Sequence, residues 1–146
     1  MSGRRLVLRP EFPFVELDRA LSALGWLGGA TVAYPPLVPG EPELAKWTKG
    51  HAEVGYSCNP AVWFRVIDAR GLTQVEWEGL SDALPHLGED EALALLGAED
   101  DARVVLGVYA VHALGVSRAG ERLASLVKHG RPLVRDLAAA ARADLA

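Results

Sequence analysis

The residues best suited to chemistry are carboxylates gathered in the middle of the chain. Nine acidic residues and no lysine or arginine lie between residues 71 and 102, and two triplets among them, Glu89-Asp90-Glu91 and Glu99-Asp100-Asp101, stand directly before predicted helices. Carboxylates there accept hydrogen bonds from free backbone amides and complement the positive end of the helix dipole. A divalent-metal site shared with His86 requires the two triplets to meet. Nine carboxylates exceed what capping needs, so they also indicate an acidic recognition surface.

We predict that this acidic segment is a partner-binding surface. Trp77 stands between Glu76 and Glu78. We expect it to be partly exposed and to act as an anchor, because tryptophan is enriched where binding energy concentrates. Trp47 and Trp63 belong either to the same recognition patch or to an aromatic core. The predicted contact residues are Glu76, Trp77, Glu78, Glu89, Asp90, Glu91, Asp100 and Asp101.

Cys58 is the only cysteine, which excludes a disulfide or a thiolate zinc cluster within one chain. A nucleophile–base pair with His51, seven residues earlier, is the catalytic interpretation. However, strand alternation places Cys58 on the same face as Val54 and Tyr56, which predicts a small core residue. None of the motifs HExxH, CxxC, GxGxxG or GxxxxGK[ST] occurs. We therefore predict no enzyme, cofactor or metal, with a small Cys/His enzyme as an alternative.

The remaining histidines and the basic residues have structural interpretations. We expect His112 to be packed and hydrogen-bonded on an apolar helix, and His86 and His129 to face solvent at helix ends. Nucleic-acid binding is opposed by the net charge of −4 and by the neighbouring acidic stretch. Ion pairs between the acids of one helical layer and the bases of the next are the simpler expectation. The bases concerned are Arg118, Arg122, Lys128, Arg131 and Arg135.

The composition describes a protein that folds around a buried core. The chain has 146 residues, half of them hydrophobic and 23% charged, which suits one domain or two small units. No uncharged apolar run is long enough to cross a bilayer, and the N-terminus lacks the apolar core of a secretory signal. We expect a cytoplasmic protein that does not bind membranes.

The first half of the chain mixes helix and strand patterns. We expect a strand at residues 6–8, a helix at 15–25, a strand at 30–34 and a helical turn at 43–47, with turns at the proline clusters between the last two. Residues 52–69 predict a hairpin that turns at Asn59-Pro60. Both faces of its second strand are largely apolar, so we expect this strand to be central in the sheet or covered on both sides.

From residue 80 onward the pattern is helical and repeats at an offset of 30 residues. Helices are predicted at 80–87, 90–96, 102–114, 119–127 and 133–145. The offset superposes Leu93, Ala94, Leu96, Val104, Ala110 and Ala113 on identical residues. The windows ALALLGAEDDARVVLGVYAVHALG and RLASLVKHGRPLVRDLAAAARADLA resemble HEAT-type helical repeats of the short bacterial kind. Such repeats imply a binding surface rather than a catalytic centre.

We therefore predict an α+β protein in which an N-terminal helix and a small antiparallel β-hairpin sheet pack on a C-terminal HEAT-like α-helical array. Residues 1–79 form the α/β capping region and residues 80–146 the repeats, and we expect the two to make one integrated domain. The predicted function is a non-catalytic protein-interaction module, such as an adaptor, regulator or scaffold, whose partner carries basic charge. Alternatives are an immunity or antitoxin-like inhibitor of a basic toxin and a nucleic-acid-binding HEAT-like protein.

Overall fold

The computed structural model describes residues 4–32, 43–59 and 64–145. The chain divides into two compact units, Met1–His86 and Leu87–Ala146. The first unit contains a sheet and two helices, and the second is helical, so the predicted α+β class is confirmed. The boundary lies seven residues later than the sequence indicated, because the helix after residue 73 belongs with the sheet.

The first unit is built on a five-stranded antiparallel sheet with the order β1-β5-β4-β3-β2. β5 lies between β1 and β4, which confirms that the second strand of the predicted hairpin is central. The sheet is larger than the predicted hairpin, because β1, β2 and β3 extend it on both sides. The strands are β1 (Arg4–Val7), β2 (Leu27–Val32), β3 (Glu43–Lys49), β4 (Ala52–Asn59) and β5 (Phe64–Arg70).

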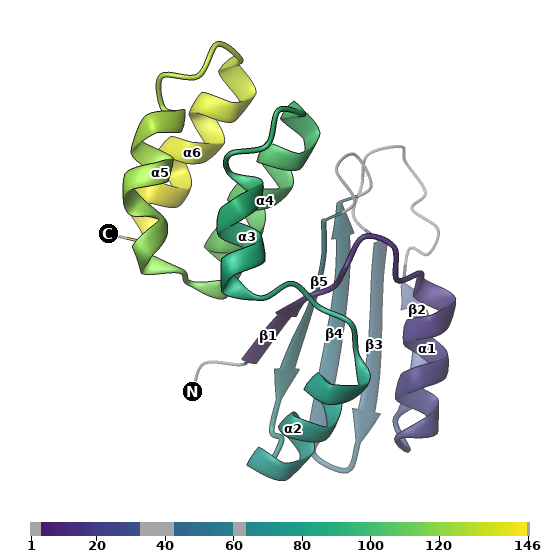
Figure 1. Ribbon diagram of the computed structural model, residues 1–146. Coiled ribbons are helices and arrows are strands. Elements are labelled where there is room, and N and C mark those ends of the chain that lie inside the picture. Colours follow the sequence, from purple (N-terminus) through teal and green to yellow (C-terminus); the bar gives the residue numbers. More distant parts are fainter. Residues whose placement is uncertain (1–3, 33–42, 60–63, 146) are drawn as a thin grey trace. The chain divides into compact units, whose positions relative to one another are not determined.

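One face of this sheet carries the core of the first unit. Along β4 every second residue is buried, and Val54, Tyr56 and Cys58 share that face as predicted. Helices α1 (Phe14–Ala23) and α2 (Gln74–Ala83) cover the same face (Figure 1). They add the buried side chains Leu17, Leu21, Leu80 and Leu84 to the core.

α2 begins at Gln74, six residues before the helix start that the sequence indicated. The missed signal is a capping box: Thr73 accepts from the backbone N–H of Glu76, and the Glu76 carboxylate accepts from the backbone N–H of Thr73. These reciprocal bonds satisfy two amides at the helix start. The helix therefore includes Trp77.

The helical turn predicted at 43–47 is wrong, because these residues belong to β3. Ala45 and Trp47 are buried while Lys46 and Thr48 are exposed, a period of two that belongs to a strand. The strand predicted at 30–34 overlaps β2, which ends at Val32. The described residues do not include residues 33 and 34 of the predicted strand, the proline clusters, or the turn after Asn59 with Trp63.

The second unit consists of two helical hairpins. In the first hairpin α3 contacts α4, in the second α5 contacts α6, and α4 contacts α6 between them. α4 ends at Leu114, and the next residue, Gly115, adopts the left-handed conformation typical of a position just beyond a helix. The elements are α3 (Glu89–Leu95), α4 (Asp101–Leu114), a 3₁₀ turn η1 (Ser117–Ala119), α5 (Gly120–Leu126) and α6 (Pro132–Leu145).

The two hairpins bury equivalent positions at the offset of 30 residues. Three pairs of residues at this spacing, one from α4 and one from α6, are buried: Val104 and Val134, Val108 and Ala138, Val111 and Ala141. The internal repeat therefore extends from the sequence to the packing. Membership of the HEAT class stays a prediction.

Gly107 marks a close approach of α3 and α4. A Cβ atom at this position would lie 2.8 Å from Cβ of Leu95 and 3.1 Å from the backbone nitrogen of Leu96. Glycine weakens a helix interior. It is tolerated here because the backbones of the two helices leave no room for a side chain.

Candidate functional site

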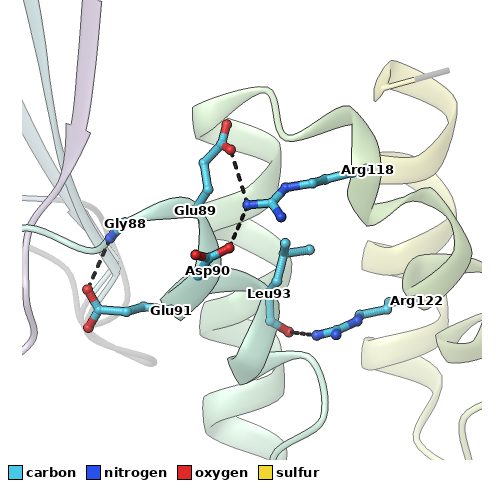
Figure 2. Close-up of polar contacts among 7 residues, drawn as sticks. All are labelled: Gly88, Glu89, Asp90, Glu91, Leu93, Arg118 and Arg122. Atoms are coloured by element: carbon cyan, nitrogen blue, oxygen red, sulfur yellow. Dashed lines mark hydrogen bonds and ion pairs between the residues drawn. The ribbon is translucent and has the colours of Figure 1, made fainter.

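The acidic residues at the start of α3 are held by the helix and by the second hairpin. Glu91 accepts a hydrogen bond from the backbone N–H of Gly88 at 3.3 Å. Asp90 and Glu89 both accept from one nitrogen of Arg118, at 2.7 and 3.3 Å (Figure 2). The hydrogen bond with Asp90 raises the pKa of Arg118 above its ordinary value. Arg118 thus joins η1 to the start of α3.

The second acidic triplet surrounds the start of α4. Asp100 caps the helix by accepting from the backbone N–H of Ala102 at 3.1 Å. Asp101 pairs with Arg131 at 2.9 Å, and Nε2 of His129 lies 3.6 Å from its other oxygen. The capping interpretation of Asp100 is therefore confirmed, and Asp101 has a second role as a partner of the second hairpin.

The two triplets stand at opposite ends of α3, whose seven residues span about 10 Å. We call Glu89, Asp90, Glu91, Asp100 and Asp101 the acidic ridge. The two ends do not meet, so the metal site that the triplets would share with His86 is not formed. No group of three or more histidine, cysteine or acidic side chains is placed to hold a metal within residues 4–32, 43–59 and 64–145.

The acidic ridge bonds to residues about 30 positions further along the chain. Arg118 reaches Glu89 and Asp90 across 29 and 28 residues, and Arg122 donates to the backbone oxygen of Leu93 across 29 (Figure 2). The expected pairing of acids in one layer with bases in the next is confirmed. Arg118, Arg122 and Arg131 thus have partners within the unit, although all five bases of the nucleic-acid hypothesis, Lys128 and Arg135 included, are exposed.

These ion pairs leave the carboxylates accessible. The side chain of Asp90 is 90% exposed and that of Glu89 is 57% exposed. Two carboxylates share a single guanidinium, so this end of the ridge keeps a net negative charge. Exposed pairs of this kind contribute at most about 1 kcal/mol to stability. Both groups are therefore available to a basic partner at little cost to the fold.

Three of the predicted contact residues, Glu76, Trp77 and Glu78, belong to α2 in the first unit. The Thr73 backbone hydrogen bond lowers the pKa of Glu76, so its carboxylate is bound to the helix start. Glu78 accepts from the side chain of Gln74 at 3.1 Å. Both carboxylates thus stabilise their own helix.

Trp77 is partly exposed, as predicted, and packs against the core of the first unit. The guanidinium of Arg4 lies 5.6 Å from the centre of its ring, within the range of a cation–π contact. Trp47 is fully buried and donates to Asp18 at 2.9 Å, so it belongs to the aromatic core rather than to a recognition patch.

Comparison of the chain with family models, with curated proteins and with solved structures finds no match. The site therefore has to be interpreted from its own geometry.

Cys58 and His51 do not form a catalytic pair. Cys58 is 1% exposed at the end of β4, and His51 is exposed in the turn before the strand begins. Seven residues of extended chain separate the two by about 23 Å. A nucleophile and its base must lie within hydrogen-bond distance, so these two residues cannot act together.

The other histidines hold the structure together. His112 Nε2 lies 2.8 Å from a carboxylate oxygen of Asp144, and this contact joins α4 to α6. Both side chains are about half exposed, so His112 is not a core residue. The expectation that His86 and His129 face solvent at helix ends holds only in part, because both are partly buried. His86 is partly buried with Nδ1 2.7 Å from the oxygen of Leu84, and Nδ1 of His129 accepts from the backbone N–H of Arg131. Each ring satisfies a backbone group near a helix end.

No helix within the described ranges is both long and apolar enough to span a bilayer.

Proposed function

We propose that the chain is a non-catalytic protein-interaction module, an adaptor, regulator or scaffold that binds a basic protein through the acidic ridge. The observation that supports this most is the exposure of Asp90 and Glu89, which share one guanidinium and keep a net negative charge. Exposed charges of one sign attract an oppositely charged partner and raise the rate of association.

We interpret the second unit as a HEAT-like pair of hairpins. An offset of 30 residues in sequence and in burial, and of 28 to 30 residues in the polar contacts between the hairpins, supports this interpretation. Helical repeats of this class present side chains of successive helices on a common surface. The ridge, which follows α3 between the two acidic triplets, fits that arrangement.

Two variants separate binding by the ridge from its structural role. The double substitution Glu89→Gln with Asp90→Asn, and the single substitution Arg118→Ala, each remove both ion pairs of Arg118. Both variants should stay folded, and the double variant should be the less stable of the two, because Glu89 and Asp90 also complement the dipole at the start of α3. Their effects on binding should be opposite, because the first removes the charge that the partner needs and the second releases it.

The partner for this test is the protein captured by the immobilised chain from the lysate of its native cells, purified and titrated directly. We expect the double variant to bind at least about tenfold more weakly and Arg118→Ala to bind as tightly as wild type or more tightly. Equal affinities of all three proteins would refute the proposal. An inhibitor of a basic toxin would use the same surface, and loss of the partner's own activity in the complex would identify it.

A further inference from the structure

Arg65 is a nearly buried charge that no carboxylate of the described residues balances. It stands on the core face of β5 with Ile67 and is only 3% exposed. Both of its hydrogen bonds leave from one nitrogen, Nη2, which donates to the backbone oxygens of Arg9 and Pro10 at 2.7 and 3.0 Å. Nε is buried and has no acceptor in the described part of the chain, where no ion pair includes Arg65. Arginine is rarely buried to this extent unless its charge is paired.

The side chain of Arg65 ends at the segment from which α1 begins. The two backbone oxygens that it bonds precede Pro13, the N-cap of α1, by four and three residues. The ring of Phe14, the first residue of the helix, lies 5.1 Å from the ring of Tyr56. Cys58, the next core residue of β4, pairs in register with Arg65. Tyr56 and Arg65 are therefore diagonal neighbours about 7–8 Å apart, a distance that an arginine side chain spans.

No side chain caps the start of α1, because its N-cap residue is Pro13. The backbone N–H groups of Glu16 and Leu17 donate to the oxygen of Pro13, whereas that of Val15 has no acceptor among the described residues. α1 has ten residues, so these amides form the positive end of a helix dipole. The carboxylate of Glu16 is bound by Arg19 at 2.8 Å. An uncapped helix start and an unbalanced guanidinium, which both attract an anion, therefore lie close together.

We propose that Arg65 and the start of α1 bind a small carboxylate ligand, whose oxygens accept from Nε–H of Arg65 and from the backbone N–H of Val15. One guanidinium balances one negative charge, whereas a phosphate dianion would place an uncompensated charge in a nearly buried position. Pro10 and Pro13 are exposed, so only a surface segment separates Arg65 from a ligand of this size. The site lies in the first unit and shares no residue with the acidic ridge, so its test is independent of the proposed function.

Titration of the isotope-labelled wild-type chain with sodium acetate tests the site, with nitrogen–proton correlation spectra as the measurement and sodium chloride keeping the ionic strength constant. The resonances of Arg65 Nε–H and of the Val15 backbone N–H should shift with one saturable dissociation constant, on the order of 1–10 mM for a single pair of this kind. Nε–H of Arg70, which is exposed on the same strand, should not shift. No saturable shift at Arg65, or equal shifts at both arginines, would overturn the proposal. This test depends on no variant.

Two conservative variants test the chemistry of the contact. Arg65→Lys keeps the positive charge but loses Nε–H, so acetate should bind at least about tenfold more weakly. Arg70→Lys is the matched control and should bind acetate as wild type does, and circular dichroism shows whether both variants fold. A folded Arg65→Lys protein with wild-type affinity would overturn the role of the guanidinium. Inorganic phosphate that saturates the same resonances more tightly than acetate would overturn the assignment to a carboxylate.

Discussion

Replacement of Gly107 by alanine tests the packing of the first hairpin. In an open helix this change stabilises by about 0.5–1 kcal/mol, because alanine loses less conformational freedom than glycine. Here the new Cβ would meet Cβ of Leu95 at 2.8 Å and backbone atoms at 3.1 Å. These atoms are not the end of a flexible side chain, so α3 and α4 must separate, at an overpacking cost of about 1–3 kcal/mol. The expected net loss is about 1 kcal/mol.

Gly79→Ala is the matched control, because Gly79 lies inside α2 with nothing within 4 Å of its missing side chain. This variant should gain about 0.5–1 kcal/mol. Urea denaturation followed by far-ultraviolet circular dichroism gives both changes, and hydrogen exchange should locate the loss from Gly107→Ala in α3 and α4. A gain in stability from Gly107→Ala equal to that of the control would show that the two helices are not packed as described.

Substitutions at four further residues have defined outcomes. Thr73→Ala removes the cap of α2 and should cost about 1 kcal/mol in denaturant unfolding. The hydrogen bond from the Thr73 backbone lowers the pKa of Glu76 from 4.5. The ionised carboxylate therefore stabilises the fold fully above pH 4.5, and this stabilisation is lost as the pH falls through the lowered pKa of the folded state. Wild type should lose stability relative to Glu76→Gln only in acid. Cys58→Ser buries a hydroxyl and should cost about 1–3 kcal/mol, more than Cys58→Ala if polarity rather than volume is responsible. Arg118→Ala should lower the urea midpoint only slightly, with no difference from wild type in high salt, because its ion pairs are exposed.

Local patterns predicted the elements whose signals lie within a few residues. The alternation of Val54, Tyr56 and Cys58 identified β4 and its buried face. The repeat and the acidic triplets identified the four helices of the second unit to within about two residues. Glu89 and Asp90 were recognised as exposed acids in the same way.

Features that depend on distant residues were not predictable from these patterns. Residues 43–47 favour a helix locally, but pairing with β4 in register, Ala45 with Tyr56 and Trp47 with Val54, makes them a strand. In the sequence Arg65 is simply a charged residue within a strand. In the structure it is only 3% exposed and donates hydrogen bonds to the backbone oxygens of Arg9 and Pro10. Nothing within its own strand indicates that the connection before α1 needs this donor.

The partner of the acidic ridge is likewise a tertiary property. The spacing of 28 to 30 residues between the acids and Arg118 or Arg131 is visible in the sequence, and it is close to the repeat offset of 30. Only the packing of η1 and α6 against the first hairpin shows which bases are used. The sequence therefore indicated the charges, and the fold shows how much of each remains exposed.

Hydrogen exchange of the chain with and without its captured basic partner tests the central claim most directly. If the acidic ridge is the binding surface, peptides covering residues 87–103 should exchange more slowly in the complex, and this protection should disappear with Glu89→Gln and Asp90→Asn. Protection confined to the sheet of the first unit, with residues 87–103 unchanged, would contradict the account.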